Sequence, residues 1–371
     1  MHPSLIGREG LIMNEIDKTA RIQYRTKVSE GVEENLTLGG KRFKKKMSLR
    51  YGENPGYPAA FYEEAEASGA NMARLKVLQE GSKGLSYINI ADMDLGQRLV
   101  VKLASIYGDE RICVLVKHEI PSGVAKKGTP AGVFEKAWNS DPLSNFGCVG
   151  VFSYTVDRET AALIVEKNRN AEVVYAPDFS VEALEVLETR KVLRVVKMAA
   201  SPGMSSQDSG LEFKRLAGGL LVQQKFDSKI ISADCVETIS KKIASPDDVE
   251  AAIFNWNIAA FTRSNAVVIG TKDKVHGIGS GQRSRIDAAE DAVRFSKRGY
   301  GPEECVLASD AFMPFPDVVE LAAANGIKAI IYPLGSVRDR EVLNRADELG
   351  LAMIVTRRAG DKDSERCFLH R

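Results

Sequence analysis

The sequence predicts an α/β protein with two domains in tandem. Short apolar runs alternate with stretches whose apolar residues recur at helical spacing, which is typical of buried sheets covered by helices. The chain has 371 residues, 44% of them hydrophobic and 27% charged, enough for two globular cores. A segment rich in Ser, Pro and Gly, residues 198–210, interrupts the alternation and marks the best candidate boundary.

The first domain is predicted from seven elements that follow a polar N-terminal stretch. The first ~45 residues are polar and weakly periodic, so we expect an extension there. The apolar runs expected to form strands are Ile112–Val116, Cys148–Phe152, Val173–Ala176 and Leu193–Val196. The segments with helical spacing are Gly132–Asn139, Arg158–Lys167 and Val181–Thr189.

The same alternation resumes after the boundary and predicts a second domain. The expected strands are Leu220–Gln223, Ala266–Gly270, Cys305–Ala308, Ala329–Tyr332 and Ala352–Val355. The expected helices are Asp247–Thr262, Ile286–Lys297, Asp317–Ala324 and Glu341–Leu349.

Composition argues against several classes of function. The 51 basic and 50 acidic residues give a net charge of +1, which does not favour a nucleic-acid partner, and the basic run at residues 41–46 is interpreted as a solvated lead-in to the first domain. The five cysteines are scattered without a Cys-x-x-Cys pair, so neither a disulfide framework nor a structural metal site is expected. No stretch approaches the roughly 18 apolar residues of a membrane span, and we expect a cytoplasmic protein.

Lys117 and His118 are the most informative pair in the chain. They end an apolar run and precede the turn Pro121-Ser122-Gly123. A histidine in this place suits a general base, because its ordinary pKa lies near 6.5. The local pattern alone favours an exposed loop histidine beside a solvated lysine over this base.

Other polar or glycine-rich clusters also follow predicted strands, where α/β sheets bind ligands. The cluster Gly277-Ile278-Gly279-Ser280-Gly281-Gln282 lacks the spacing and the lysine of a phosphate loop. We therefore expect its glycines to permit a close approach of backbone to backbone or to a ligand.

Taken in order, these clusters resemble the transformylase half of the AICAR transformylase/IMP cyclohydrolase family. The resemblance spans residues ~47 to 371, and its motifs are Leu49-Arg50-Tyr51-Gly52-Glu53-Asn54-Pro55, Lys117-His118 with Pro121 and Gly123, Asp141-Pro142-Leu143-Ser144-Asn145-Phe146-Gly147, Ala176-Pro177, Gly218–Gln223, Arg263-Ser264-Asn265-Ala266, Gly277–Gln282 with Ser284-Arg285, Ser309-Asp310-Ala311-Phe312, and Arg366, Phe368 and His370. It implies two tandem three-layer α/β domains with the cytidine-deaminase-like fold of the transformylase, at residues 47–205 and 206–371, after an extension at residues 1–46.

The resemblance also implies an activity, which is formyl transfer from 10-formyltetrahydrofolate to the 5-amino group of AICAR. The implied catalytic residues are His118 as general base, Lys117 as electrostatic and proton-delivery assistant, and Asn265 near the formyl group. The implied substrate-binding residues are Arg50, Tyr51, Asn89, Phe146, Gly147, Asp310, Phe312, Arg366, Phe368 and His370. No metal is implied, and the family builds its sites across a homodimer.

The cyclohydrolase motifs do not occur in this sequence, so a stand-alone transformylase is expected, with a separate IMP cyclohydrolase in the pathway. The sequence departs from the family pattern at Gly56, Glu119 and Ile120. These departures leave open a binder of AICAR or folate without turnover, and a formyltransferase with another donor or acceptor. A zinc deaminase is disfavoured, because its His-x-Glu and Pro-Cys-x-x-Cys motifs are missing.

Overall fold

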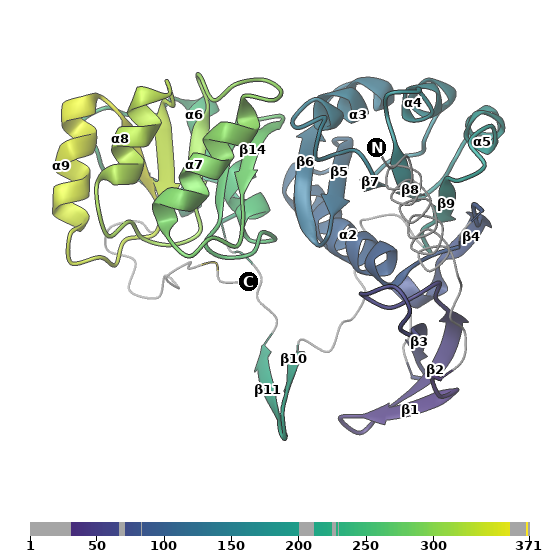
Figure 1. Cartoon of the computed structure of the whole chain (residues 1–371). Helices are drawn as coiled ribbons and strands as arrows, with labels where there is room; N and C mark the ends of the chain where they lie inside the picture. Colours follow the sequence, from purple (N-terminus) through teal and green to yellow (C-terminus); the bar gives the residue numbers. More distant parts are fainter. Residues whose placement is uncertain are drawn as a thin grey trace, which may run out of the picture.

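Two six-stranded sheets, each with helices on both faces, stand side by side in the protein (Figure 1). The computed structural model describes residues 31–66, 71–82, 84–199, 211–224, 228, 230–356 and 369. The α/β class that the alternating pattern predicts is confirmed.

The first sheet has the strand order β4-β9-β8-β7-β5-β6, with β7, β8 and β9 parallel and the other pairs antiparallel. Its strands are β4 (Lys76–Gln79), β5 (Ile112–Lys117), β6 (Ile120–Lys126), β7 (Cys148–Phe152), β8 (Ala171–Ala176) and β9 (Arg194–Lys197). Its helices are the 3-10 turn η1 (Met72–Arg74), α2 (Tyr87–Tyr107), α3 (Pro130–Trp138), α4 (Arg158–Ile164) and α5 (Val181–Glu188).

The second sheet repeats this plan element for element, in the order β12-β17-β16-β15-β13-β14 and with the same strand directions. Its strands are β12 (Glu237–Thr238), β13 (Val267–Gly270), β14 (Val275–Gly279), β15 (Val306–Ser309), β16 (Ala329–Tyr332) and β17 (Ala352–Val355). Its helices are η2 (Ala233–Cys235), α6 (Pro246–Ala259), α7 (Arg285–Ser296), α8 (Asp317–Ala324) and α9 (Asp339–Leu349). We refer to the two sheets with their helices as the first and second units.

Helix α2 is the main element of the first unit that the sequence pattern does not predict. Ser86 and Asn89 cap its start reciprocally, and Gly108, at φ 62°, ends it. Gly96 lies in its middle, where a Cβ would come within 2.5 Å of the Val151 side chain. A mid-helix glycine weakens the helical signal, yet here it lets the helix lie close against the sheet.

The hydrophobic core continues across both units. Helices α2 and α6 bury side chains such as Leu99 and Trp256 in one cluster that also contains Val114 and Ile331 from the two sheets. Helices α3 to α5 cover the opposite face of the first sheet, and α7 to α9 cover that of the second. Each unit therefore has three layers, and the α2 and α6 layer holds the units together.

The units also meet at the edge strands β6 and β14, which lie next to each other in Figure 1. The backbone N–H of Lys126 donates to the Asp273 carbonyl (2.8 Å), and Ala125 and Lys274 form an antiparallel bridge. The side chain of Lys126 is fully buried at this seam, between Glu110 of the first unit (3.0 Å) and Glu250 of the second (2.8 Å).

Two smaller sheets differ from the sequence prediction. Strands β1 (Asn35–Leu38), β2 (Lys41–Ser48) and β3 (Ala60–Glu64) form an antiparallel sheet, so the basic run, interpreted from the sequence as a solvated lead-in, lies in a strand. Its charges are matched by acids, as in the pairs of Lys41 with Glu64 (2.6 Å) and of Lys46 with Glu63 (3.7 Å). Alternation of half-buried and exposed side chains in β2 satisfies the strand period even though the sequence is basic.

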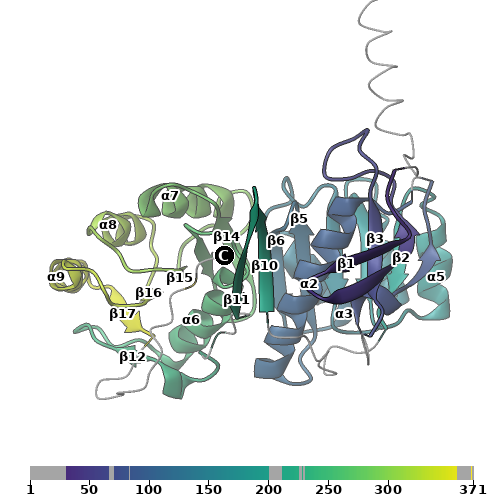
Figure 2. The same ribbon diagram turned by 90° about the horizontal axis from the view of Figure 1, so that it is seen from below.

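The run Leu220–Gln223 forms a strand, as predicted, but outside the second sheet. It lies in β11 (Gly219–Gln224), which among the described strands pairs only with β10 (Leu211–Leu216), in a hairpin that projects below the two units in Figure 1 and lies in front of their junction in Figure 2. Its apolar side chains are exposed, including Phe213 (50%), Leu221 (55%) and Val222 (53%).

Candidate functional site

The Lys117-His118 pair lies at the tip of the β5–β6 hairpin. Lys117 pairs with Ile120, so His118 and Glu119 form a two-residue loop. Both have positive φ, 54° and 58°, which is the geometry of a type I′ turn. This turn matches the twist of the hairpin but normally selects Asn and Gly, since other residues pay a steric cost there.

The side chain of Asp92, on helix α2, accepts hydrogen bonds from both residues of this turn. Its Oδ2 accepts the backbone N–H of His118 (3.2 Å) and its Oδ1 accepts that of Glu119 (2.6 Å). Burial raises the pKa of Asp92 to about 7; the charges of Glu119 and Glu172 act in the same direction, while the two backbone hydrogen bonds oppose them. The histidine backbone is thus fixed while its side chain stays exposed.

Lys117 is held against the loop that precedes β7. Its Nζ donates to the Phe146 carbonyl (2.5 Å), and a Cβ added to Gly147, at φ 87°, would lie 3.6 Å from that Nζ. The Phe146 side chain is 52% exposed. The structure therefore brings three of the predicted residues, Lys117, Phe146 and Gly147, into one cluster.

The predicted ribotide residues gather beside the first turn of α2. Arg50, Tyr51 and Asn89 are all buried, and the Arg50 guanidinium lies 4.7 Å from the centre of the Tyr51 ring. The Asn89 amide donates to Glu172 (3.4 Å). Asn89 and Asp92 are one helical turn apart, so a single helix face contributes to this cluster and to the Lys117-His118 turn.

A second buried arginine, Arg194, lies near this cluster and is missed by the sequence analysis. Arg194 begins β9, is 3% exposed, and contacts Glu172 (3.5 Å) and the Gly84 carbonyl (2.9 Å). Burial lowers the pKa of Arg194; the charge of Glu172 opposes this shift, and the neighbouring charge of Arg50 adds to it. Two cations brought together out of water form a site that an anion would stabilise.

In the second unit, Asn265 lies just before β13 and is fixed by the glycine-rich cluster. Its side-chain amide donates to the Gln282 carbonyl (2.8 Å). A Cβ at Gly279 would come within 1.8 Å of the Ala288 carbonyl oxygen, and one at Gly277 within 2.1 Å of that of Ala292. The expected role of these glycines, a close approach of backbone to backbone, is confirmed.

Asp310 and Phe312 follow β15 at the same end of the second sheet. Asp310 is fully buried and forms an ion pair with Arg285, while its backbone N–H donates to Ala266 (3.2 Å). Phe312 is 36% exposed, so it is not a core residue. Arg366, Phe368 and His370, the other predicted substrate-binding residues, lie outside the described part of the chain.

The two groups of residues lie at the same end of the strands in the paired sheets. Because β6 and β14 are antiparallel, with Ala125 bridged to Lys274, the start of β6 lies near the end of β14. Asn265, next to the end of β14 across the β13–β14 pair, is therefore on the same edge as His118. His118 lies in the turn between β5 and β6, so two to three strand spacings separate its backbone from that of Asn265 within one chain, on the order of 10 to 14 Å.

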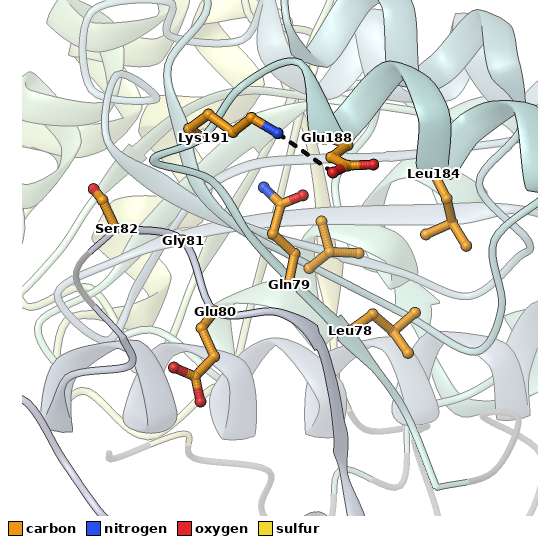
Figure 3. A pocket seen from close by; sticks show the side chains of 9 residues that line it. Leu78, Gln79, Glu80, Gly81, Ser82, Leu184, Glu188 and Lys191 are labelled. Atoms are coloured by element: carbon orange, nitrogen blue, oxygen red, sulfur yellow. Dashed lines mark hydrogen bonds and ion pairs between the residues drawn. The ribbon is translucent and has the colours of Figure 1, made fainter.

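A surface pocket of about 660 Å³ lies elsewhere, against the edge strand β4 and helix α5. Figure 3 shows its lining, which includes the exposed ion pair of Lys191 with Glu188 (3.3 Å). None of the predicted site residues lines it.

Within the described residues, no helix is long and apolar enough to cross a membrane, and no group of three or more His, Cys, Asp or Glu residues is arranged to hold a metal ion.

Comparison with known proteins adds the family. Residues 11–295 match the family model described as the AICARFT/IMPCHase bienzyme. The chain belongs to this family. The resemblance noted from the ordered motifs is thereby confirmed.

Curated members of the family are similar over most of the chain. The chain is 38% identical over 341 residues to the bifunctional purine biosynthesis protein PurH of Neisseria gonorrhoeae, which covers 90% of the chain and 62% of the relative. It is 40% identical over 316 residues to the protein of the same name from Acidithiobacillus ferrooxidans, which covers 85% of the chain and 58% of the relative. The chain thus spans about three fifths of the length of these relatives.

Proposed function

We propose that the chain transfers the formyl group of 10-formyltetrahydrofolate to the 5-amino group of AICAR, in the cytoplasm and without a metal. The observation that carries the proposal is the Lys117-His118 pair presented on a hairpin turn that Asp92 of α2 holds, together with two buried arginines, Arg50 and Arg194. Membership of the AICARFT/IMPCHase family supports it.

The chemistry assigns different work to the two residues. The AICAR amine attacks the formyl carbon, His118 accepts the proton that the amine loses, and the C–N10 bond of the folate then breaks. Lys117, whose Nζ is held at the Phe146 carbonyl, stabilises the oxyanion and supplies a proton to the leaving nitrogen. The products are the formylated ribotide and tetrahydrofolate, so atoms and charge balance.

The binding groups fit the two substrates. Arg50 and Arg194 are suited to the ribotide phosphate, because a guanidinium pair binds a dianion with several charge-assisted hydrogen bonds. The exposed rings of Phe146 and Phe312 offer stacking faces to a pterin. Asn265 orients the formyl oxygen as a neutral donor.

We also propose that the active site is shared between the two subunits of a homodimer. The resemblance to the family implies sites built across a homodimer, and membership of the family supports this proposal. The exposed apolar hairpin β10–β11 supports association with a second copy, because a monomer rarely exposes a contiguous apolar surface of this kind.

Mixing two inactive variants tests the shared site. If each site combines His118 of one subunit with Asn265 of the other, subunit exchange between His118→Ala and Asn265→Ala restores about a quarter of wild-type activity, since half of the dimers hold one intact site. Sites contained within one subunit would show no recovery. Charge on the hairpin, as in Leu221→Lys with Val222→Lys, is expected to give a monomer in light scattering, whereas a dimer in that variant would contradict the assigned role.

We further propose that both units have the cytidine-deaminase-like fold of the transformylase. The repeated strand order and the three layers of each unit support this proposal. The domain limits 47–205 and 206–371 remain predictions; β9 ends at Lys197 and the second sheet begins at Glu237.

A direct assay tests the reaction. The protein is mixed with AICAR and 10-formyltetrahydrofolate, tetrahydrofolate release is followed, and the ribotide product is identified by its mass. We expect formylated ribotide to accumulate, with ring closure left to a separate cyclohydrolase. Ribotide binding without turnover would favour the alternative of a non-catalytic binder, turnover only with another donor or acceptor would favour a related formyltransferase, and inosine monophosphate would contradict the expected division of labour.

A further inference from the structure

The β5–β6 turn is built from residues that do not favour it. In a type I′ turn both central residues have positive φ, and neither His118 nor Glu119 is a glycine or asparagine. Sterically costly backbone of this kind persists only where the surroundings hold it in place. The turn therefore needs an external support to present the His118 side chain in one orientation.

Asp92 is placed to give that support. Its two carboxylate oxygens accept the two N–H groups of the turn, one each, at 3.2 and 2.6 Å. The residue is 3% exposed, and within the described residues no lysine or arginine forms an ion pair with it. Burial without a neighbouring cation disfavours the charged form of a carboxylate. The hydrogen bonds that Asp92 accepts from the two consecutive backbone N–H groups offset part of this cost.

The location of Asp92 connects the turn to the rest of the site. It lies one helical turn after Asn89, on a 21-residue helix that begins with a reciprocal cap and packs into the core shared by both units. The helix is thus a rigid base. A side chain fixed to it orients the turn relative to the cluster of Arg50, Tyr51 and Asn89.

We propose that Asp92 is a positioning residue that fixes the His118-Glu119 turn and thereby aims the His118 imidazole at the acceptor amine. The inference rests on the proposed formyl transfer and adds a residue to it. Asp92 itself touches no reacting atom. It acts through two backbone hydrogen bonds, and its effect falls on turnover and not on ribotide affinity.

Rescue by a turn residue distinguishes this role from a general structural one. Glycine adopts positive φ without steric cost, so Glu119→Gly makes the turn stable by itself. Asp92→Ala is expected to lower kcat by roughly 10- to 100-fold, as expected when a catalytic group is misplaced, and Asp92→Ala with Glu119→Gly is expected to recover most of the loss. The binding constant for AICAR should change by less than about 3-fold in each variant.

Asp94→Asn is the matched control. Asp94 lies on the same helix two residues further on and forms a surface pair with Arg98 (2.9 Å), so its substitution removes a carboxylate without touching the turn. We expect kcat within about 3-fold of wild type for this variant and for Glu119→Gly alone. Unchanged kcat in Asp92→Ala would overturn the proposal, as would a folded Asp92→Ala that glycine at position 119 does not rescue.

Amide hydrogen exchange tests whether Asp92 holds the turn, independently of formyl transfer. If the wild type shows no formyl transfer, the proposed function fails, but exchange at the N–H groups of His118 and Glu119 still tests the support. Faster exchange at these two amides in Asp92→Ala, and not in Asp94→Asn, is the expected result. Unchanged exchange at both would show that Asp92 does not hold the turn.

Discussion

Lys126 provides the sharpest test of how the two units are joined. Its ammonium is fully buried between Glu110 and Glu250, at 3.0 and 2.8 Å, and lies 4.1 Å from the centre of the Tyr107 ring. The two carboxylates are unlike it, because their side chains remain 29% and 40% exposed. Each partner can therefore be removed with a different consequence.

Removal of the lysine should cost less than removal of the acids. In Lys126→Met the packed stem is retained and the carboxylates rehydrate, so we expect a loss of about 1 to 2 kcal/mol in the free energy of unfolding. In Glu110→Gln with Glu250→Gln the ammonium stays buried without a counter-charge, and the expected loss is about 3 to 5 kcal/mol. The exposed pair of Lys272 with Asp247 is the control, and Lys272→Met should cost less than about 0.5 kcal/mol.

Urea unfolding measures these differences, and the two tryptophans report on the units separately. Trp138 lies in α3 of the first unit and Trp256 in α6 of the second. With one tryptophan replaced by phenylalanine in each background, the midpoints of the two units should separate in the double glutamine variant and coincide in the wild type. A methionine variant less stable than the double glutamine variant would refute the reasoning.

Two further predictions concern Asp92 and the glycine cluster. Burial raises the pKa of Asp92 from 3.8 to about 7, so its contribution to stability is present below about pH 4 and is lost as the pH rises through about 7. The unfolding free energy of Asp92→Asn relative to wild type should therefore rise across that interval, by on the order of 2 to 4 kcal/mol in urea titrations. A difference that does not change with pH would contradict the effect of burial on Asp92. Gly279→Ala places a Cβ 1.8 Å from the Ala288 carbonyl oxygen and should lower the free energy of unfolding by at least about 2 kcal/mol in the same measurement. Gly219→Ala is the control, since nothing lies within 4 Å of its Cβ, and should change that free energy by less than about 0.5 kcal/mol. Equal effects of the two substitutions would show that the close approach of Gly279 to α7 is not needed.

Much of the fold is predictable because buried strands leave a strong local signal. The runs at Ile112–Val116 and Ala329–Tyr332 consist almost wholly of apolar residues and became central strands. The three-stranded sheet was missed for the opposite reason, since a half-exposed strand such as β2 carries as many lysines as a solvated loop. The buried edge strands β6 and β14 were missed because glycine and polar residues interrupt their apolar runs. The duplication of the units came only from the family resemblance, because it lies in strand order and leaves no repeat in the sequence pattern.

The candidate site was predictable only in part. Lys117 and His118 were found because they follow a strand directly, and the ordered motifs that resemble the family supplied Arg50, Asn89 and Asn265. Asp92 precedes His118 by 26 residues on a helix that the pattern did not predict, and its role depends on the direction of two backbone N–H groups. Periodicity carries no information of that kind.

Formyl transfer by the wild type compared with His118→Ala tests the central claim most directly. Both proteins are given AICAR and 10-formyltetrahydrofolate, formylated ribotide is quantified by mass, and AICAR binding is measured separately by calorimetry. We expect turnover by the wild type. In His118→Ala we expect a rate of formyl transfer lower by about 100-fold or more, with AICAR affinity retained. Equal rates in the two proteins would contradict the role of His118, and binding without turnover in the wild type would contradict the proposed reaction.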